Sequence, residues 1–456
     1  MKRLQPVLNR RQFVAGGVAA SGMSCVAAGS SVPPNIVIIL ADDLGYGDLS
    51  CYGHPTIQTP NIDRMEREGM RFTQFYSAAS LCTPSRAGLM TGRLPIRSGL
   101  TRVLFPWSEG GIQDSEITIA RLLKKSGYAA MCVGKWHLGH HRRYLPMRHG
   151  FDGYFGIPYS NDMSKATQPT ASWVDRTPPT PLIRGEEVIE QEPDQRYLTR
   201  RYTEEAIRFI RESCRAGRPF FLYLPHTFPH MPLFASERFR GKSLRGLYGD
   251  VVEELDWSVG EILAELGRLG VDGSTLVAFT SDNGPATGSA GLLRDQKAST
   301  FEGGMRVPFI ARWPGRIPAA VTTSAFGTTM DLFPTCARLA GATLPTDRIY
   351  DGDDLTPVLL RNSTGREPLF FYYSNLDDDQ ELKAVRKGRW KLHTSIGSFR
   401  KAPLLPNESG PPLLFDLNED PSEQRNLAGT KPEIAKELRV VMEAHKASVR
   451  PGPQQL

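Results

Sequence analysis

Two pairs of oxygen-bearing side chains, Asp42–Asp43 and Asp282–Asn283, each stand directly after an apolar, strand-like run of the sequence. Three carboxylates and one amide are hard oxygen donors, which suit Ca²⁺ or Mg²⁺ rather than zinc. Asp and Asn are also common turn residues, so either pair alone is better explained as the end of a strand. Two such pairs at equivalent places in the chain favour a divalent-metal site.

The segment from Cys82 to Arg93 has the pattern of a helix with a reactive side chain at its start. Pro84 fits the first helical turn, and Gly92 suits the C-terminal cap. Cys82 is then expected at the positive end of the helix dipole, which favours thiolates and anions, with Arg86 one turn further on the same face. A small buried thiol in a loop explains the local pattern equally well.

Further cations can surround a tetrahedral anion at this point. Lys135 and His137 are two residues apart in a segment expected to be extended, so both should project to one side. His230 and Lys297 join them if their loops meet above the sheet. Taken alone, Lys297 is typical of a surface lysine and His230 of a hydrogen-bonded loop residue. Together with Arg86 they would form a cationic site with histidines for proton transfer.

The elements that must position these groups predict an α/β fold. Strands that alternate with helices indicate a large, mostly parallel sheet flanked by helices on both faces. The candidate groups fall just past the carboxyl ends of strands, where open α/β sheets place their sites. Besides the helix at Cys82, the expected strands are 34–41, 128–133, 219–224 and 275–280, and the expected helices are 61–68, 116–125, 197–215 and 249–269.

A shift in composition after about Asp354 indicates a second, smaller region. Short strand-like runs predict an antiparallel sheet over 369–373, 382–385, 390–393 and 413–417, with a helix over 432–447 packed against it. We therefore expect a catalytic α/β domain over 31–360 and a small C-terminal α+β domain over 361–456. The Pro-, Thr- and Arg-rich stretch 161–196 is expected to be a long surface excursion near the site.

Residues 1–30 have the features of an export signal. Arg10 and Arg11 precede a weakly apolar, Ala- and Gly-rich run over 15–28, which resembles a twin-arginine signal with a cleavage region near 27–30. The run is too short to span a membrane, and Cys25 has a poor context for lipidation. The protein is therefore expected to be exported, to the periplasm or beyond, with no membrane span.

Charge and cysteine spacing argue against two further classes of protein. The net charge of +6 includes four basic residues within 1–30, where no acidic residue stands, so charge gives no support for nucleic-acid binding. The six cysteines show no C-x-x-C pair and no zinc-finger spacing. The composition of the whole chain, 40% hydrophobic and 23% charged, is that of an ordinary globular protein.

Taken together, these motifs resemble the sulfatase family of the alkaline-phosphatase superfamily. Cys-x-Pro-x-Arg is a weak pattern alone, but it is specific in this order and with these neighbours. The resemblance spans nearly the whole chain after the export signal and is carried by 34–36, 42–48, 82–86, 92–93, 134–139, 281–284, 301–304, 414–417 and 420–423. Residues 92–97 and 156–160 look most like the arylsulfatase A and N-acetylgalactosamine-6-sulfatase branch.

The resemblance implies a hydrolase of sulfate monoesters in which a separate maturation enzyme oxidises Cys82 to Cα-formylglycine (3-oxoalanine). It implies a metal, expected to be Ca²⁺ with Mg²⁺ as the alternative, held by Asp42, Asp43, residue 82, Asp282 and Asn283. The sulfate-binding and catalytic groups that it implies are Arg86, Lys135, His137, His230 and Lys297, with Ser160 as a minor member. His226 competes with His230 for one role, and the His-x-Pro spacing favours His230.

The implied chemistry uses the hydrated aldehyde, which carries two hydroxyls on one carbon. One hydroxyl attacks sulfur while His230 or Lys297 protonates the leaving alcohol, and the other, deprotonated by His137, then expels sulfate. The expected substrate is a sulfated small molecule or glycan fragment, selected by residues of 101–111 and 161–196. Two alternatives remain: a phosphodiesterase or phosphonate hydrolase of the same superfamily, and a non-catalytic protein that binds sulfated glycans.

Overall fold

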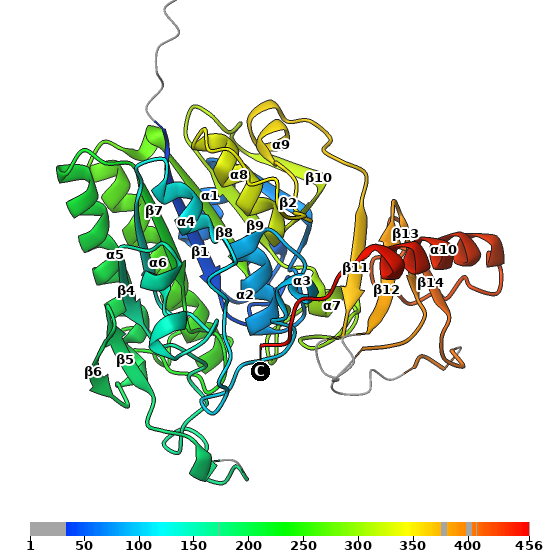
Figure 1. Ribbon diagram of the computed structural model, residues 1–456, viewed down its shortest axis with the longest axis horizontal. Coiled ribbons are helices and arrows are strands. Elements are labelled where there is room, and N and C mark those ends of the chain that lie inside the picture. The colour runs from blue at the N-terminus through cyan, green and yellow to red at the C-terminus, as the bar shows by residue number, and fades with distance from the viewer. Residues whose placement is uncertain (1–32, 173, 375–380, 398–403, 407, 456) are drawn as a thin grey trace, which may run out of the picture. The chain divides into compact units, whose positions relative to one another are not determined.

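β1 (Asn35–Ala41) lies in the interior of a ten-stranded sheet in this computed structural model (Figure 1). The structure describes residues 33–455 except 173, 375–380, 398–403 and 407. The predicted export signal over 1–30, with Cys25, lies outside the described residues. None of the helices within the described ranges combines the length and hydropathy that a membrane-spanning segment needs.

The large sheet is mostly parallel, as predicted. Its other strands are β2 (Met70–Tyr76), β3 (Ala129–Val133), β4 (Gly153–Gly156), β5 (Pro181–Arg184), β6 (Glu187–Gln191), β7 (Phe220–Pro225), β8 (Thr275–Ser281), β9 (Phe309–Arg312) and β10 (Val321–Thr328). The strand order is β10-β2-β9-β8-β1-β7-β3-β4-β5-β6. β1 pairs in parallel with both β7 and β8. Among the described strands of this sheet, antiparallel pairing is confined to the pairs that β9 makes with β2 and β8 and to those that β5 makes with β4 and β6.

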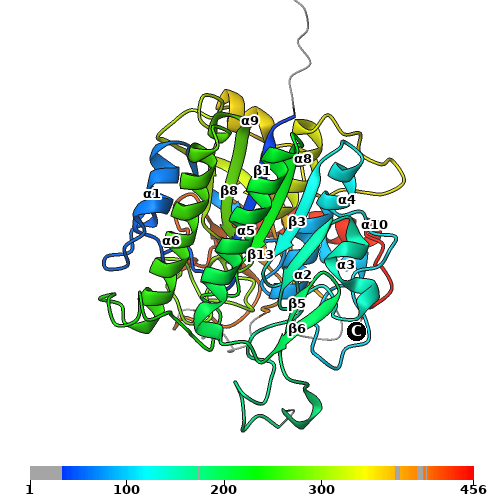
Figure 2. The ribbon, with the colours of Figure 1, turned by 90° about the vertical axis from the view of Figure 1, so that its left-hand side faces the viewer.

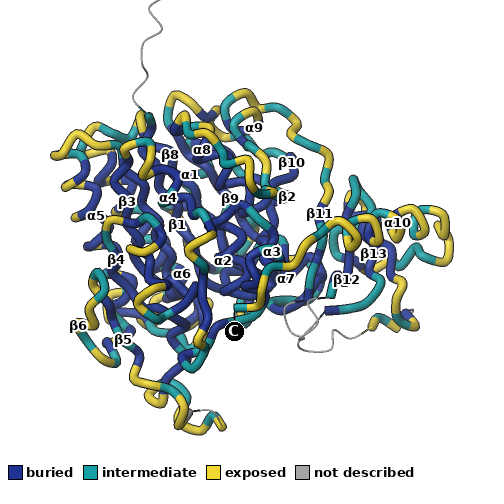
Figure 3. The backbone as a smooth tube through the Cα atoms, viewed as in Figure 1, coloured by how far each residue is buried: buried dark blue, intermediate teal, exposed yellow. Residues whose placement is uncertain are grey.

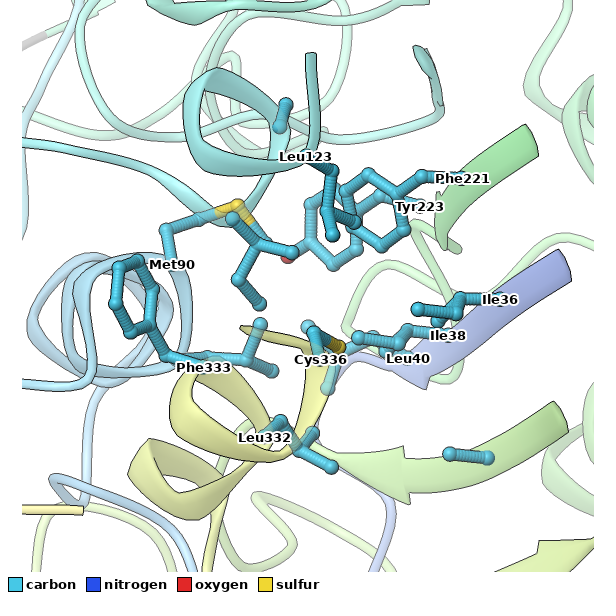
Figure 4. Packing of buried hydrophobic residues seen from close by; sticks show 14 of the residues in the cluster. Ile36, Ile38, Leu40, Met90, Leu123, Phe221, Tyr223, Leu332, Phe333 and Cys336 are labelled. Atoms are coloured by element: carbon cyan, nitrogen blue, oxygen red, sulfur yellow. The ribbon is translucent and has the colours of Figure 1, made fainter. Parts of the chain in front are cut away.

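Both faces of the sheet are covered by helices because β1 is apolar on both sides. Ile36, Ile38 and Leu40 pack on one face, against α2 (Cys82–Thr91), α4 (Ile119–Lys124) and α8 (Leu332–Leu339) (Figure 4). Val37 and Ile39 pack on the other, against α1 (Pro60–Arg67), α5 (Leu198–Arg215) and α6 (Leu247–Arg268) (Figure 2). The central strands are accordingly buried along their length (Figure 3).

The predicted antiparallel sheet is present in the C-terminal region. It is built from β11 (Leu369–Tyr373), β12 (Leu382–Lys387), β13 (Trp390–His393) and β14 (Leu413–Asp416), in that order. α10 (Pro432–Ser448) packs on it through Leu438 and Met442. Three short helices complete the described α-helices: α3 (Pro95–Ser98), α7 (Glu302–Met305) and α9 (Thr356–Arg361).

Some elements differ from the prediction. The helix expected over 116–125 begins only at Ile119, because Thr118 is its N-cap and accepts the Arg121 N–H through its hydroxyl oxygen (3.1 Å). The stretch 161–196, predicted as a surface excursion, also contains the β5–β6 hairpin, which extends the sheet at one edge. β2, β4, β9, β10 and α8 are further elements beyond the predicted set.

Candidate active site

The predicted metal ligands meet at the carboxyl ends of β1 and β8. The two strands pair in parallel up to their last residues, so Asp42 and Asp282 leave the sheet side by side. The Asp43 N–H donates to Asp282 Oδ1 (3.1 Å), and Asn283 Nδ2 donates to Asp43 Oδ1 (2.7 Å). All four side chains are buried. The structure therefore brings together two residue pairs that are about 240 positions apart in the chain.

Cys82 is the first residue of α2, as predicted, and Gly92 caps the helix in the left-handed conformation (φ 68°). The Cys82 Sγ lies 3.6 Å from Asp42 Oδ1. Burial raises the pKa of this thiol to about 12, in spite of the ammonium groups of Lys135 and Lys297. The cost of desolvation therefore exceeds the attraction of the cations for the unmodified side chain.

Arg86 links the two carboxylates that end β1 and β8. Its Nε and Nη2 donate to Asp282 Oδ2 at 3.0 and 2.8 Å, and Nη2 lies 3.2 Å from Asp42 Oδ2. Nη1 donates to the backbone oxygen of Lys135 (2.8 Å). The guanidinium is fully buried, so these partners replace the water that it loses.

Two lysines approach Cys82 from different parts of the chain. Lys135 Nζ is 2.5 Å from Asp42 Oδ2, 3.6 Å from Cys82 Sγ and 3.1 Å from Ser160 Oγ. Lys297 Nζ is 2.6 Å from Asp43 Oδ1 and 3.4 Å from Cys82 Sγ. The two ammonium groups therefore converge on the same sulfur atom.

His230 joins this group and His226 does not. His230 Nε2 lies 3.4 Å from Ser160 Oγ and 3.6 Å from Asp43 Oδ2, while Nδ1 lies 3.1 Å from Asn161 Oδ1. His226 Nε2 instead lies 3.3 Å from the hydroxyl oxygen of Ser258. The geometry thus agrees with the preference for His230 that the sequence suggested.

His137 lies near the site in a different conformation from the one expected. Its backbone is left-handed (φ 57°), so the segment Lys135–His137 is not extended and the two side chains are not brought together by strand alternation. His137 Nε2 lies 2.9 Å from the backbone oxygen of Leu104, and its buried Nδ1 has no described hydrogen-bond partner. Burial, reinforced by the charge of Lys135, lowers its pKa well below the ordinary value.

The neighbouring carboxylates differ in acidity. Burial opposes the ionisation of Asp42, but Lys135 and Arg86 outweigh burial and hold its pKa below the ordinary value. Burial and the charge of Asp42 raise the pKa of Asp282 to about 6, in spite of Arg86. Charges of both signs are therefore packed together at buried positions here, which is typical of functional sites.

Asn283 supplies a test of whether the residues fit a metal. Its Oδ1 is buried and has no hydrogen-bond partner among the residues that the structure describes. Such an oxygen is costly unless a cation or water contacts it. One donor atom from each of Asp42, Asp43, Cys82 and His230 lies within 4.8 Å of the others. The carboxylate oxygens of Asp42 and Asp43 and the free Oδ1 of Asn283 fit a hard divalent cation, whereas the Cys82 sulfur and the His230 nitrogen are softer donors.

Among carboxylate, thiol and imidazole donors, this tight group differs from the predicted ligand set in two respects. His230 belongs to it, and Asp282 does not. Asp282 Oδ2 accepts both hydrogen bonds from Arg86, and Oδ1 accepts the Asp43 N–H. Asp282 thus holds the neighbouring groups in place in this arrangement.

A cavity of about 840 Å³ opens onto Cys82. The predicted site residues that line it are Cys82, His137, Ser160, His230 and Lys297. The segments 101–111 and 161–196, which we predicted to select the substrate, also contribute to the lining. Their lining residues are Arg102, Val103, Phe105, Trp107, Ser108, Glu109, Asp162 and Met163. The rings of Phe105 and Trp107 are stacked 4.7 Å apart, and the Arg176 guanidinium lies 4.8 Å from the Trp107 ring centre.

Two contributors to the site had little signal in the sequence. Asn161 contacts His230 Nδ1, as does the Met231 backbone oxygen, and the only sequence signal of Asn161 is that it follows Ser160. Gln296 lines the cavity beside Lys297, and an isolated glutamine in a loop carries no recognisable pattern.

Comparison with known proteins identifies the family. The sequence model of the sulfatase family matches residues 34–342, and that of the C-terminal region of aryl-sulfatase matches residues 364–456. Arylsulfatase A of Bos taurus is 43% identical over 93% of this chain and 90% of its own length. N-acetylgalactosamine-6-sulfatase of Rattus norvegicus is 42% identical over 96% of this chain and 90% of its own length.

A solved structure supports the same assignment. The PsFucS1 sulfatase from Pseudoalteromonas sp. superposes with a TM-score of 0.81 at 30% identity, covering 92% of each chain. Since both sequence and fold match over nearly the whole described chain, the protein belongs to the sulfatase family and is a hydrolase of sulfate esters.

Proposed function

We propose that this sulfatase acts through a Cα-formylglycine derived from Cys82 and a divalent metal beside it, and that its substrate is a sulfated carbohydrate. The observation that carries the proposal is the cluster of four strand-end groups and three cations beside residue 82, whose Sγ lies within 3.6 Å of Asp42, Lys135 and Lys297. As its hydrate, the aldehyde supplies an oxygen nucleophile and a second hydroxyl for the release of sulfate. The buried cysteine thiol, with its raised pKa, supplies no comparable nucleophile.

The metal would be held by Asp42, Asp43, Asp282, Asn283 and residue 82, with His230 close by. Ca²⁺ suits this set of oxygen donors, and Mg²⁺ is the alternative. A bound dication stabilises negative charge on oxygen as a Lewis acid. Three carboxylates face the cations of Arg86, Lys135 and Lys297, so the protein groups alone are close to neutral. A dication adds the positive charge that an anionic ester requires.

The chain's own residues can bind the sulfate group and carry protons. Lys135 and Lys297 flank residue 82 at 3.6 and 3.4 Å, where their ammonium groups can donate to sulfate oxygens. Ser160 bridges Lys135 and His230. His230 and Lys297 both line the cavity and are the two candidates for donating a proton to the leaving alcohol.

Mass spectrometry of the peptide spanning residue 82 tests the central claim. We expect the side chain of Cys82 to have lost its sulfur and become an aldehyde in protein matured with its oxidising enzyme. Cys82→Ala and Cys82→Ser should abolish turnover while leaving the fold intact. An unmodified thiol in fully active protein would refute the role assigned to residue 82. Preference for an aryl phosphodiester over the matched aryl sulfate would support the alternative phosphodiesterase activity instead.

The leaving group separates the two candidate proton donors. His230→Ala and Lys297→Ala should each be assayed with a series of aryl sulfates whose phenols differ in pKa. The variant that lacks the donor should lose most activity on the most basic leaving groups, because these depend most on protonation. The variant that lacks only a binding group should lose activity evenly across the series.

A sulfated carbohydrate is the proposed substrate because of the relatives and the cavity together. One relative is named for N-acetylgalactosamine 6-sulfate hydrolysis. The cavity offers aromatic rings beside charged groups, and its volume holds a ligand larger than sulfate alone. A panel of sulfated mono- and disaccharides tests this proposal; turnover of aryl sulfates but of no member of a broad sugar panel would argue against it.

Export and maturation complete the proposal. Arg10, Arg11 and the apolar run over 15–28 favour the twin-arginine route to the periplasm or beyond. Cys82 is only 2% exposed, so a maturation enzyme must reach it before the chain closes around α2. Replacing Arg10 and Arg11 by lysine should retain the protein in the cytoplasm, as fractionation would measure, and unchanged export would contradict the route.

A further inference from the structure

The loop that carries Lys297 is strained on both sides of this residue. Asp295 (φ 63°) and Ala298 (φ 66°) have left-handed backbones, which non-glycine residues adopt only where their surroundings hold them. Inside the loop, the Lys297 N–H donates to the Pro285 oxygen (3.0 Å) and the Ala298 N–H to the Ser80 oxygen (2.9 Å). The position of the lysine therefore depends on these two bonds and on whatever holds the ends of the loop.

The loop rests on the two glycines of α7. A Cβ atom on Gly303 would overlap the backbone oxygen of Asp295, and one on Gly304 would overlap that of Ser299. The Gly303 N–H donates to the Arg294 oxygen (2.8 Å). Because the loop lies directly on this helix, a shift of α7 moves the loop with it.

α7 is held in turn by the C-terminal sheet. The Glu302 N–H donates to Glu423 Oε2 (2.6 Å), and Glu302 Oε1 accepts from Lys391 Nζ (2.9 Å). Lys391 Nζ also lies 3.0 Å from Glu423 Oε1. Lys391 belongs to β13, and Glu423 follows β14. All three side chains are completely buried, so water competes with none of these contacts.

The other end of the loop reaches the same residue. Arg294 Nη1 donates to the backbone oxygen of Glu423 (2.9 Å). The guanidinium is fixed by two further hydrogen bonds to Glu408, at 2.9 and 2.8 Å. Glu423 thus contacts both ends of the segment 294–302, one through its backbone oxygen and the other through its carboxylate.

We propose that Glu423, supported by Lys391, is a positioning residue of the active site. It fixes both ends of the loop 294–302 and so places the Lys297 ammonium group beside residue 82. The inference rests on the proposed role of Lys297. Neither Glu423 nor Lys391 lines the cavity, so their effect on turnover must pass through the loop. This also explains why the motifs 301–304 and 420–423 occur together with the motifs that carry the site residues. The two motifs contact each other through the hydrogen bond from Glu302 to Glu423.

A double-mutant cycle tests whether Glu423 acts through Lys297. We expect Glu423→Ala to lower kcat/KM for 4-nitrophenyl sulfate by about tenfold in the otherwise native enzyme. In the Lys297→Ala background the same change should cost less than about twofold, because the group that it positions is already gone. An equal loss in both backgrounds overturns the inference. Full activity of Lys297→Ala alone refutes the proposed role of Lys297 instead, and the inference with it.

Binding of inorganic sulfate provides a readout that does not require turnover. The rise in melting temperature on adding sulfate should be reduced by Glu423→Ala and by Lys297→Ala to a similar extent, and no further by both together. An undiminished shift in Glu423→Ala overturns the inference. If this variant does not fold, Glu423→Gln serves, since its amide oxygen can still accept the Glu302 N–H; it should retain kcat/KM within about threefold.

A matched control separates positioning from general stability. Asp272→Asn breaks a similarly short ion pair, to the nearly buried Arg312 (2.6 Å), near the opposite end of β8. We expect this variant to lose stability while keeping its kcat/KM. If Asp272→Asn and Glu423→Ala lose activity in proportion to their loss of stability, Glu423 has no positioning role.

Discussion

Arg86 and Asp282 are joined through a single oxygen atom: two guanidinium nitrogens donate to Asp282 Oδ2 at 3.0 and 2.8 Å, and both side chains are inaccessible to solvent. The same guanidinium lies 3.2 Å from Asp42. One cation therefore contacts two carboxylates that end neighbouring strands, and it holds them in place before any substrate binds.

Replacing Arg86 by methionine should leave Asp282 buried without its principal cation, and Asp42 with Lys135 as its main remaining partner. We expect the free energy of unfolding to fall by about 3–5 kcal/mol, as measured by urea denaturation at pH 7. Arg200→Met, which removes an exposed i,i+4 pair with Glu204, is the control and should cost less than about 1 kcal/mol. Equal small losses in the two variants would show that Arg86 does not neutralise the pair.

Removal of divalent ions should inactivate the enzyme and lower its melting temperature, because a ligand that binds only the folded state stabilises it. Adding Ca²⁺ back should reverse both effects. Asn283→Ala should raise the Ca²⁺ concentration needed for half-reactivation by at least about tenfold, since it deletes the unpartnered Oδ1. Asn35→Ala, at the other end of β1, should leave the Ca²⁺ requirement unchanged. Full activity after exhaustive chelation would contradict the metal site.

Acid should weaken the contact between α7 and the C-terminal sheet. Burial opposes the ionisation of Glu302, but Lys391 and Arg306 lower its pKa to about 2. A carboxylate with a depressed pKa stabilises the fold above its ordinary pKa, about 4.5, and this stability is lost as the pH falls towards 2. The free energy of unfolding, measured between pH 7 and 3, should therefore fall less steeply in Glu302→Gln than in the parent protein. The exposed control Glu212→Gln should keep the parental slope.

Trp107→Ala should change which esters are hydrolysed rather than the chemical step. The indole lines the cavity and stacks on Phe105. We expect KM for a sulfated disaccharide to rise by up to about tenfold, while kcat for 4-nitrophenyl sulfate changes little. A matched loss of kcat on both substrates would mean that the ring supports the reacting groups themselves.

Local sequence patterns predicted most of the active-site side chains that lie at the ends of strands or at the start of α2. Asp42 and Asp282 follow apolar runs, and parallel pairing of buried strands brings their ends together whatever the length of chain between them. Cys82 begins its helix because Pro84 and Gly92 mark the two ends. In each case the information lies within about ten residues of the functional group.

The remaining features depend on contacts that no local pattern contains. The left-handed turn at His137 and the high pKa of Cys82 both follow from packing around the site. The hairpin of β5 and β6 is short and largely polar, so periodicity gives little sign of it. The hydrogen bond from the Glu302 N–H to the Glu423 carboxylate joins residues that are 121 positions apart. The charged side chains of Glu423 and its partner Lys391 are completely buried.

The pairing of Ala41 with Ser281 has a consequence for how this chain can vary. The register of the parallel pairing fixes where the last side chain of each strand lies. A shift of one residue in this register turns that side chain to the opposite face of the sheet. Insertions or deletions inside β1 or β8 should therefore destroy the enzyme, whereas changes of length in the outlying 164–180 segment should be tolerated. Libraries that aim at new substrates can vary that segment freely while the two strands keep their lengths.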